Sequence, residues 1–185
     1  DIDWKYNQIN YPSGIKGRLL GKLKNVNYEA KNTSVYKSDT TNELFGAVGY
    51  LAEINLFKKM RDNAAHLLTP KMLLRYAPGH MRKETENTRL NHSNVFKLDR
   101  LNTNKNFENG LSATLGFDYE VNKSNKKIDF SIAQIINEKE NQNMPSSSSL
   151  NQRFSDVIGH SELQINDTIS LNYDFALDQN YKSLN

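Results

Sequence analysis

Apolar and polar residues alternate along much of this chain, most regularly near its C-terminus. From position 169 to 177 every odd-numbered residue is apolar and every even-numbered residue is polar or small. Side chains on a β-strand point alternately to its two faces, so this segment is predicted to be a strand with one apolar and one polar face. Residues 155–165 repeat the pattern more weakly. The short pair Asn166-Asp167 between the two segments predicts a tight antiparallel hairpin.

The same period recurs from the N-terminus onward. The predicted strands, in order, are approximately 2–10, 15–30, 44–57, 66–77, 107–121, 127–137, 155–165 and 168–178. Pro70 lies inside one of them and cannot donate a hydrogen bond to a neighbouring strand, so it predicts a local irregularity or a sheet edge. After Asn25 the apolar residues change parity to Val26, Tyr28 and Ala30. This change predicts either a β-bulge or the end of the apolar band.

The connections between these strands alternate between short and long. The long ones, about 31–42, 78–106 and 138–153, are polar and lack any period. In an antiparallel meander this order places every long loop at one end of the sheet and every tight turn at the other. Outer-membrane barrels show that asymmetry, and their strands need about 9–11 residues to cross a bilayer at a tilt. We therefore predict an all-β fold, an antiparallel up-and-down meander of roughly seven to eight strands within a transmembrane barrel.

Two other classes of protein share this alternation. A soluble antiparallel sandwich or a lipocalin-like ligand-binding barrel has the same period, and a generic outer-membrane porin or receptor has the same loop asymmetry. Tyrosines at strand ends or on the apolar parity favour a membrane protein, because aromatic residues gather at the two bilayer interfaces. These tyrosines are Tyr11, Tyr28, Tyr50, Tyr76, Tyr119 and Tyr173.

The amino-acid composition further limits the classes of protein to which the chain can belong. The 185 residues are 37% hydrophobic with a mean hydropathy of −0.74, which suits a disordered chain, a thin sheet or a barrel with a polar lumen. The aromatic residues and the long alternating runs disfavour disorder. The net charge of +3, with both signs interspersed, gives no indication of a nucleic-acid partner. The absence of cysteine excludes disulfides and thiolate metal sites within the chain. The first residue is Asp1 rather than methionine, so we expect a fragment.

Several short segments are similar to those of one outer-membrane family. They occur in the family's order and spacing, and their characteristic positions are His66, Pro70, Phe96, Arg100, Gly110, Gln134, Ser155, Asp156 and Gly159. From about His66 to Leu177 the chain resembles the C-terminal barrel domain of LptD, the family of lipopolysaccharide-assembly proteins also called organic-solvent-tolerance proteins. Two positions depart from the family pattern. Ser149 stands where a glycine is usual, and Ala133 replaces a glycine.

The resemblance implies that residues 1–185 are one partial domain, an open wall segment of a very large barrel with a strand number in the mid-twenties. It implies a location in the cell outer membrane, in contact with outer-membrane lipid. The family passes lipopolysaccharide from periplasmic bridge proteins, which contact an N-terminal domain absent from this chain, into the outer leaflet. The resemblance also implies a lumenal lipoprotein plug of the LptE type. The seam between the first and last strands of the barrel is expected outside the chain.

If the polar parity faces the lumen, its charged and amide side chains are candidate contacts for lipopolysaccharide or for the plug. These residues are Arg18, Lys22, Lys24, Lys71, Arg75, Asp118, Glu120, Asn172 and Asp174. The basic stripe on the strand 15–30 could bind lipid A phosphates through charge-assisted hydrogen bonds. The alternative is that these residues are merely solvated on a polar face, some of them snorkelling to a rim.

No set of residues predicts catalysis. His160 and Ser161 are adjacent on a strand and point to opposite faces, so they cannot form a nucleophile–base pair. We expect no enzymatic activity, no cofactor and no metal, because the histidines at 66, 80 and 92 are far apart in the sequence. Asp99-Arg100 is expected to be a loop ion pair, which stabilises little if it is exposed.

Overall fold

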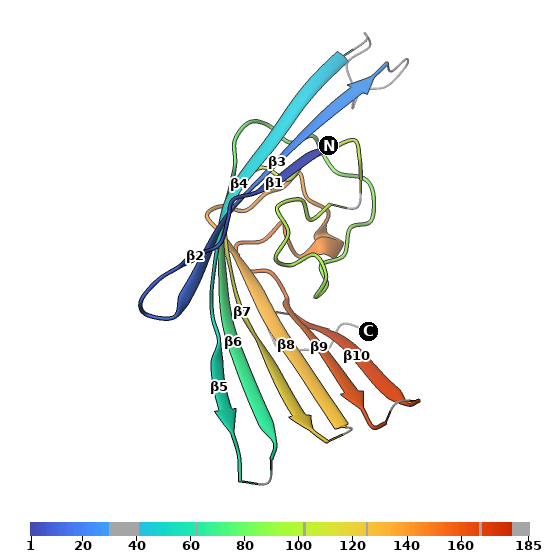
Figure 1. Ribbon diagram of the computed structural model, residues 1–185. Coiled ribbons are helices and arrows are strands. Elements are labelled where there is room, and N and C mark those ends of the chain that lie inside the picture. The colour runs from blue at the N-terminus through green and yellow to red at the C-terminus, as the bar shows by residue number, and fades with distance from the viewer. Residues whose placement is uncertain (30–40, 62, 102, 125, 167, 179–185) are drawn as a thin grey trace.

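The computed structural model describes residues 1–29, 41–61, 63–101, 103–124, 126–166 and 168–178, which form one antiparallel sheet (Figure 1). Its ten strands follow the order β1-β3-β4-β6-β7-β8-β9-β10, with β2 paired to β3 and β5 paired to β6. Within the described residues β1 and β10 have no strand beyond them, so the sheet is open. The predicted all-β antiparallel meander is therefore confirmed.

The main strands are longer than those of most globular sheets. β3, β4 and β7 each contain 14 residues, which exceeds the roughly 9–11 residues that cross a bilayer at a tilt. The elements are β1 (Ile2–Lys5), β2 (Ile9–Asn10), β3 (Ile15–Tyr28), β4 (Thr41–Ile54), β5 (Leu56–Lys59), β6 (Ala65–Ala77), β7 (Gly110–Lys123), β8 (Lys126–Asn137), the single-turn 3₁₀ helix η1 (Ser146–Ser148), β9 (Val157–Gln164) and β10 (Ser170–Leu177).

Some element boundaries differ from the predicted ones. The predicted strand 2–10 is two short strands, both paired to β3, and the predicted strand 44–57 begins three residues earlier, at Thr41, and is divided at Asn55. The strand expected from position 107 begins at Gly110, whose φ of +108° is a conformation that glycine adopts readily. Ala30, most of the loop predicted at 31–42, and Asp167 of the predicted turn lie outside the described residues.

The two faces of the sheet differ in chemistry. The outer face carries apolar side chains that are largely exposed: Leu19, Leu23, Val48, Met72, Leu74, Tyr76, Leu111, Leu115, Leu171 and Tyr173. The opposite face, called the inner face here, carries the polar parity and is the side against which the chain segments 78–101, 103–109 and 138–156 pack. Among the described residues no helix is long and apolar enough to span a membrane.

The core lies between the inner face and these two loops, not between two sheets. One cluster joins strand residues such as Leu73 and Phe45 to Leu98 and Phe107 of the first loop. A second cluster joins Ile135 to Leu150 of the other loop and to further residues of both loops. Apolar side chains on the polar parity are therefore buried beneath the loops.

This core explains the change of parity after Asn25. β3 and β4 pair without interruption from Ile15↔Ile54 to Tyr28↔Thr41, so the strand contains no bulge. Val26 lies on the inner face and is 7% exposed, within the cluster that contains Phe45 and Phe107. Tyr28 also faces inward, so it does not belong to an interfacial girdle on the outer face.

Pro70 does mark an irregularity, although β6 is not an edge strand. β4 pairs with β6 as far as Glu53↔Lys71, and pairing resumes with β5 at Leu56↔Leu68. Thr69 and Pro70 lie between these two paired segments and are paired with no residue of β4 or β5. Because proline has no N–H to donate, the neighbouring strand is interrupted there. β6 itself continues through the proline and pairs with β7 over its full length.

Candidate functional site on the inner face

A buried ion pair fixes the first long loop to the inner face. Arg100 and Glu108, both in this loop, are 1% and 3% exposed, and Arg100 Nε donates to Glu108 Oε2 at 2.7 Å. Arg100 also donates to the hydroxyl of Ser112 on β7 at 3.0 Å. Arg75 of β6, 1% exposed, donates to the carbonyl oxygens of Leu98 and Glu108. The loop is thus tied to two neighbouring strands.

A second buried contact fixes the same loop to β3. Lys24 Nζ lies 2.6 Å from Asp99 Oδ2 and donates to the carbonyl oxygens of Thr103 at 2.9 Å and Asn106 at 3.2 Å. The side chain of Lys24 is 3% exposed. Burying a charge is costly unless it is paired and hydrogen-bonded. The Asp99 carboxylate pairs with the Lys24 ammonium, and the two backbone carbonyls accept its remaining hydrogen bonds.

These contacts correct the expectation for Asp99-Arg100. The two residues do not pair with each other at an exposed site. Asp99 pairs with Lys24, and Arg100 pairs with Glu108 in a position shielded from water. Buried ion pairs are expensive to break, because removing one partner leaves the other charge unpaired.

The electrostatics of Glu108 follow from these neighbours. Burial by itself would raise the pKa of Glu108, but the positive charges of Arg100 and Arg75 and the hydrogen bond from Arg100 outweigh burial. The pKa of Glu108 is therefore lowered from its ordinary value, and the carboxylate is ionised at neutral pH.

Two cavities flank Phe96 on the part of the inner face that the loops leave open. One, of about 440 Å³, is lined by Lys71, Asp118, Glu120 and other residues of β6 to β9. The other, of about 550 Å³, is lined by Arg18, Lys22 and neighbouring residues of β1, β3 and the loop. Phe96 borders both, and Lys71 Nζ lies 5.9 Å from the centre of its ring. The open inner face is therefore charged and hollowed.

The nine predicted lumen-facing residues all lie on the inner face, in different surroundings. Lys24 and Arg75 are buried beneath the first loop and bonded to it, whereas Lys22 pairs with Asp3 at 3.2 Å and Arg18 donates to Gln8 at 3.1 Å. Lys71 pairs with Asp118 across β6 and β7. Glu120 pairs with Lys127 at 3.5 Å, Asn172 is exposed opposite Glu162, and Asp174 accepts hydrogen bonds from two histidines.

Several family-motif residues have local structural roles. His66 Nδ1 lies 2.7 Å from the Tyr119 hydroxyl, which joins β6 to β7 on the outer face. Gln134 donates to the carbonyl oxygen of Ser155 at 2.9 Å, and the Ser155 hydroxyl accepts a hydrogen bond from the N–H of Ile135. Ser155, which precedes β9, therefore extends the pairing with β8.

The two departures from the family pattern also have structural explanations. Ser149 adopts φ +54°, the left-handed conformation that favours glycine, and its hydroxyl accepts a hydrogen bond from the N–H of Asp156 at 3.0 Å. Ala133 lies opposite Gly116 in the β7–β8 pair, and a Cβ on Gly116 would lie 2.8 Å from the Ala133 Cβ. The absence of a side chain at Gly116 therefore leaves room for the Ala133 methyl group. Gly159 leaves room for the ring of Phe175, which lies over it.

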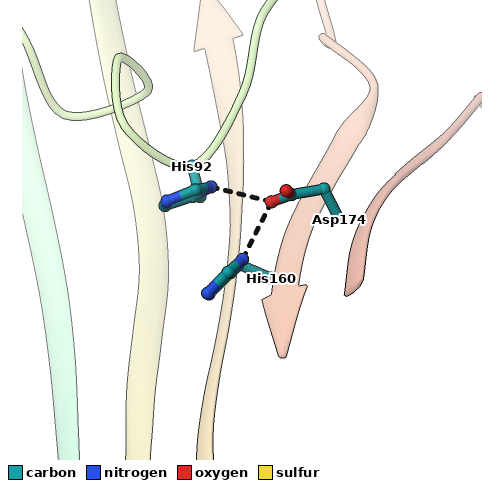
Figure 2. Close-up of side chains that lie close together, drawn as sticks. All are labelled: His92, His160 and Asp174. Atoms are coloured by element: carbon teal, nitrogen blue, oxygen red, sulfur yellow. Dashed lines mark hydrogen bonds and ion pairs between the residues drawn. The ribbon is translucent and has the colours of Figure 1, made fainter. Parts of the chain in front are cut away.

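Sequence reasoning missed two groupings. Nothing in the sequence indicates that Glu108 is the partner of Arg100. His92, His160 and Asp174 meet at one point on the inner face (Figure 2). The alternation of β9 and β10 does place His160 and Asp174 on one face, and their register makes them direct neighbours. Nothing in the sequence pattern indicates that His92, in an aperiodic loop, joins them.

An open sheet with strands long enough to span a bilayer, an exposed apolar outer face and a charged inner face partly covered by its own loops defines a wall segment of an outer-membrane β-barrel. A family model described as LptD, LPS transport system D, matches residues 18–185. The chain belongs to the LptD family, an outer-membrane family of lipopolysaccharide transport, and the soluble-barrel alternative is set aside. No curated protein and no solved structure matches the chain.

Proposed function

We propose that this chain forms part of the wall of a lipopolysaccharide translocon and guides lipopolysaccharide towards the outer leaflet without catalysing a reaction. The observation that carries the proposal is the contrast between an exposed apolar outer face and a charged inner face with two open cavities beside Phe96. Such a wall can sit in hydrocarbon on one side and solvate a polar headgroup on the other.

The two cavities suit different parts of the headgroup. Arg18 and Lys22 line the larger cavity, where guanidinium and ammonium groups can donate charge-assisted hydrogen bonds to phosphate. The smaller cavity places Lys71 beside Asp118 and Glu120, whose carboxylate oxygens can accept hydrogen bonds from sugar hydroxyls. We assign no such role to Lys24 and Arg75, because the loop covers both side chains and supplies their hydrogen-bond partners.

The proposed partners of the chain follow from the same contrast between the two faces of the sheet. Asn172 and the open parts of the inner face are available to a lumenal lipoprotein plug of the LptE type, whereas the outer face meets membrane lipid. Periplasmic bridge proteins would deliver lipopolysaccharide to the complete protein. These assignments rest on the proposed transport role.

Photocrosslinking tests the proposal with two adjacent positions of β6. In the complete protein, in living cells, a photoreactive residue replaces Lys71 on the inner face or, as a matched control at the same depth, Met72 on the outer face. We expect position 71 to crosslink to lipopolysaccharide only while new lipopolysaccharide is being made. Position 72 should crosslink to resident membrane lipid whether or not synthesis continues.

The double substitution R18Q/K22Q adds a test of the phosphate contacts. It should weaken crosslinking from a neighbouring inner-face position, because two phosphate-binding cations are lost. The matched control is K58Q/K59Q, which removes two exposed charges on β5 away from both cavities. The transport proposal is overturned if position 71 never crosslinks to lipopolysaccharide during active synthesis.

A further inference from the structure

A side chain of the first long loop meets two side chains of the β9–β10 hairpin on the inner face. Asp174 Oδ1 lies 2.9 Å from His92 Nδ1 and 2.9 Å from His160 Nδ1 (Figure 2). The two imidazole rings are stacked with their centres 4.1 Å apart. The potential ligand atoms of the three residues all lie within 4.8 Å of one another. Both Nδ1 atoms therefore face the same carboxylate oxygen of Asp174.

Each of the three residues is held in place by independent contacts. His160 and Asp174 are opposite each other in the β9–β10 pair, so the backbone ladder fixes their separation. His92 lies in a turn in which the Asn91 side chain accepts from the N–H of Ser93 at 2.9 Å, and the Asn94 side chain accepts from the N–H of Asn91 at 2.9 Å. A site built this way loses little conformational entropy when a ligand binds.

The apolar core beneath the turn that contains His92 fixes the distance of this turn from the sheet. Val95, three residues after His92, is 2% exposed and packs in the cluster that contains Ile135 and Ile158. Ile158 is two residues before His160 and on the same face of β9. The loop cannot move away from β9 without opening this cluster.

We propose that His92, His160 and Asp174 bind a zinc ion, which fastens the first long loop to β9 and β10. Two imidazole nitrogens and one carboxylate oxygen are ligands that zinc accepts, with water completing the coordination. Zinc lies about 2.0–2.2 Å from such ligands, so ligand atoms at the tetrahedral angle are about 3.3–3.5 Å apart. The two 2.9 Å contacts need to open by only a few tenths of an ångström to reach that spacing.

The surroundings leave room for the water ligand. The side chains of His92 and Asp174 are 41% and 63% exposed, and His92 and His160 both line the cavity of about 440 Å³. Without a metal, the same three residues form a hydrogen-bonded contact only. A bound zinc ion would take the place of the protons in the two hydrogen bonds. Metal–ligand bonds are stronger and have a fixed geometry, so the ion would hold one wall of the cavity in place.

Zinc binding to the complete protein tests this assignment directly. The protein is folded in detergent, stripped with a chelator and dialysed against a slight excess of zinc, and bound metal is counted by mass spectrometry. Because other parts of the protein can bind zinc, the readout is the difference between the unaltered protein and His92→Gln or His160→Gln. Each substitution is expected to remove one bound ion per chain. The matched control, His80→Gln, alters a 69% exposed histidine outside the cluster and should remove none.

Limited trypsin digestion supplies a second readout. Arg89 and Lys97 flank His92 in the loop, and zinc should slow cleavage at these sites several-fold in the unaltered protein and not in His160→Gln. Heat-modifiable migration on gels confirms that each variant is folded. Equal zinc content in the unaltered protein and in both cluster variants overturns the proposal, as does zinc binding that leaves digestion of the loop unchanged.

Discussion

Arg100 Nε lies 2.7 Å from Glu108 Oε2, and both side chains are buried between the first long loop and the inner face of the sheet. Arg75 approaches the same region from β6 and bonds to the loop backbone on either side of Arg100. The loop is therefore folded onto the barrel wall by charge and hydrogen bonding as well as by apolar contacts, and its position over the inner face is specific.

Removing one member of this pair should release the loop. Arg100→Ala leaves the Glu108 carboxylate buried without its partner, a change that typically costs about 3–5 kcal/mol. We expect a large loss of amide hydrogen-exchange protection in residues 98–108 and a lower urea midpoint for the folded barrel. Lys105→Ala is the control, since its exposed contact with Glu86 at 3.9 Å should contribute only about 0–1 kcal/mol. Equal effects of the two substitutions would contradict the buried-pair interpretation.

Acid should release the same loop. The pKa of Glu108 is lower in the folded protein than its ordinary value of 4.5, so its stabilising contribution is complete above that value and is lost as the pH falls through the lowered pKa. Hydrogen exchange in residues 98–108 should therefore show constant protection from neutral pH down to about pH 5, and a decline in more acidic solution. In Glu108→Gln the acid-dependent step should disappear, because the amide does not titrate; persistence of the step would assign it to another group.

Charge on the outer face should destabilise the membrane-inserted state. Leu115 lies near the middle of β7 and is 45% exposed on the apolar face. Leu115→Arg is expected to cost about 2–4 kcal/mol in a bilayer, measured by urea unfolding from lipid vesicles. The control is Ser131→Arg, at an inner-face position that lines the cavity of about 440 Å³ and can hydrate the added charge. A greater loss for Ser131→Arg would reverse the assignment of the two faces.

Gly116 should not accept a side chain. A Cβ at this position would approach the carbonyl oxygen of Ile132 and lie 2.8 Å from the Ala133 Cβ, so β7 and β8 would have to separate. Gly116→Ala should cost about 1–3 kcal/mol of unfolding free energy, as overpacking typically does. Adding Ala133→Gly should restore part of that loss by removing the Cβ–Cβ contact. In Gly159→Ala the ring of Phe175 can move outward, so a smaller loss is expected, and a larger loss there would show that the ring cannot move.

The sequence alone was sufficient for the main strands, their two faces and the end of the sheet at which the described long loops lie, although it did not show that the predicted strands 2–10 and 44–57 are each divided. Alternation with a period of two is a local property, and an antiparallel meander converts connection lengths into positions without further information. The interruption caused by Pro70 was also predictable, because a missing N–H is a property of the residue itself.

Only the tertiary structure decided what the long loops do. Lys24 is 79 residues from Thr103, which accepts its hydrogen bond, and His92 is 82 residues from Asp174. The polar parity of β3 and β6 identifies Lys24 and Arg75 as inward-facing, yet it does not separate buried loop anchors from residues that remain open to a passing ligand. That separation depends on how aperiodic segments fold across the sheet, and such long-range contacts leave no regular pattern in the sequence.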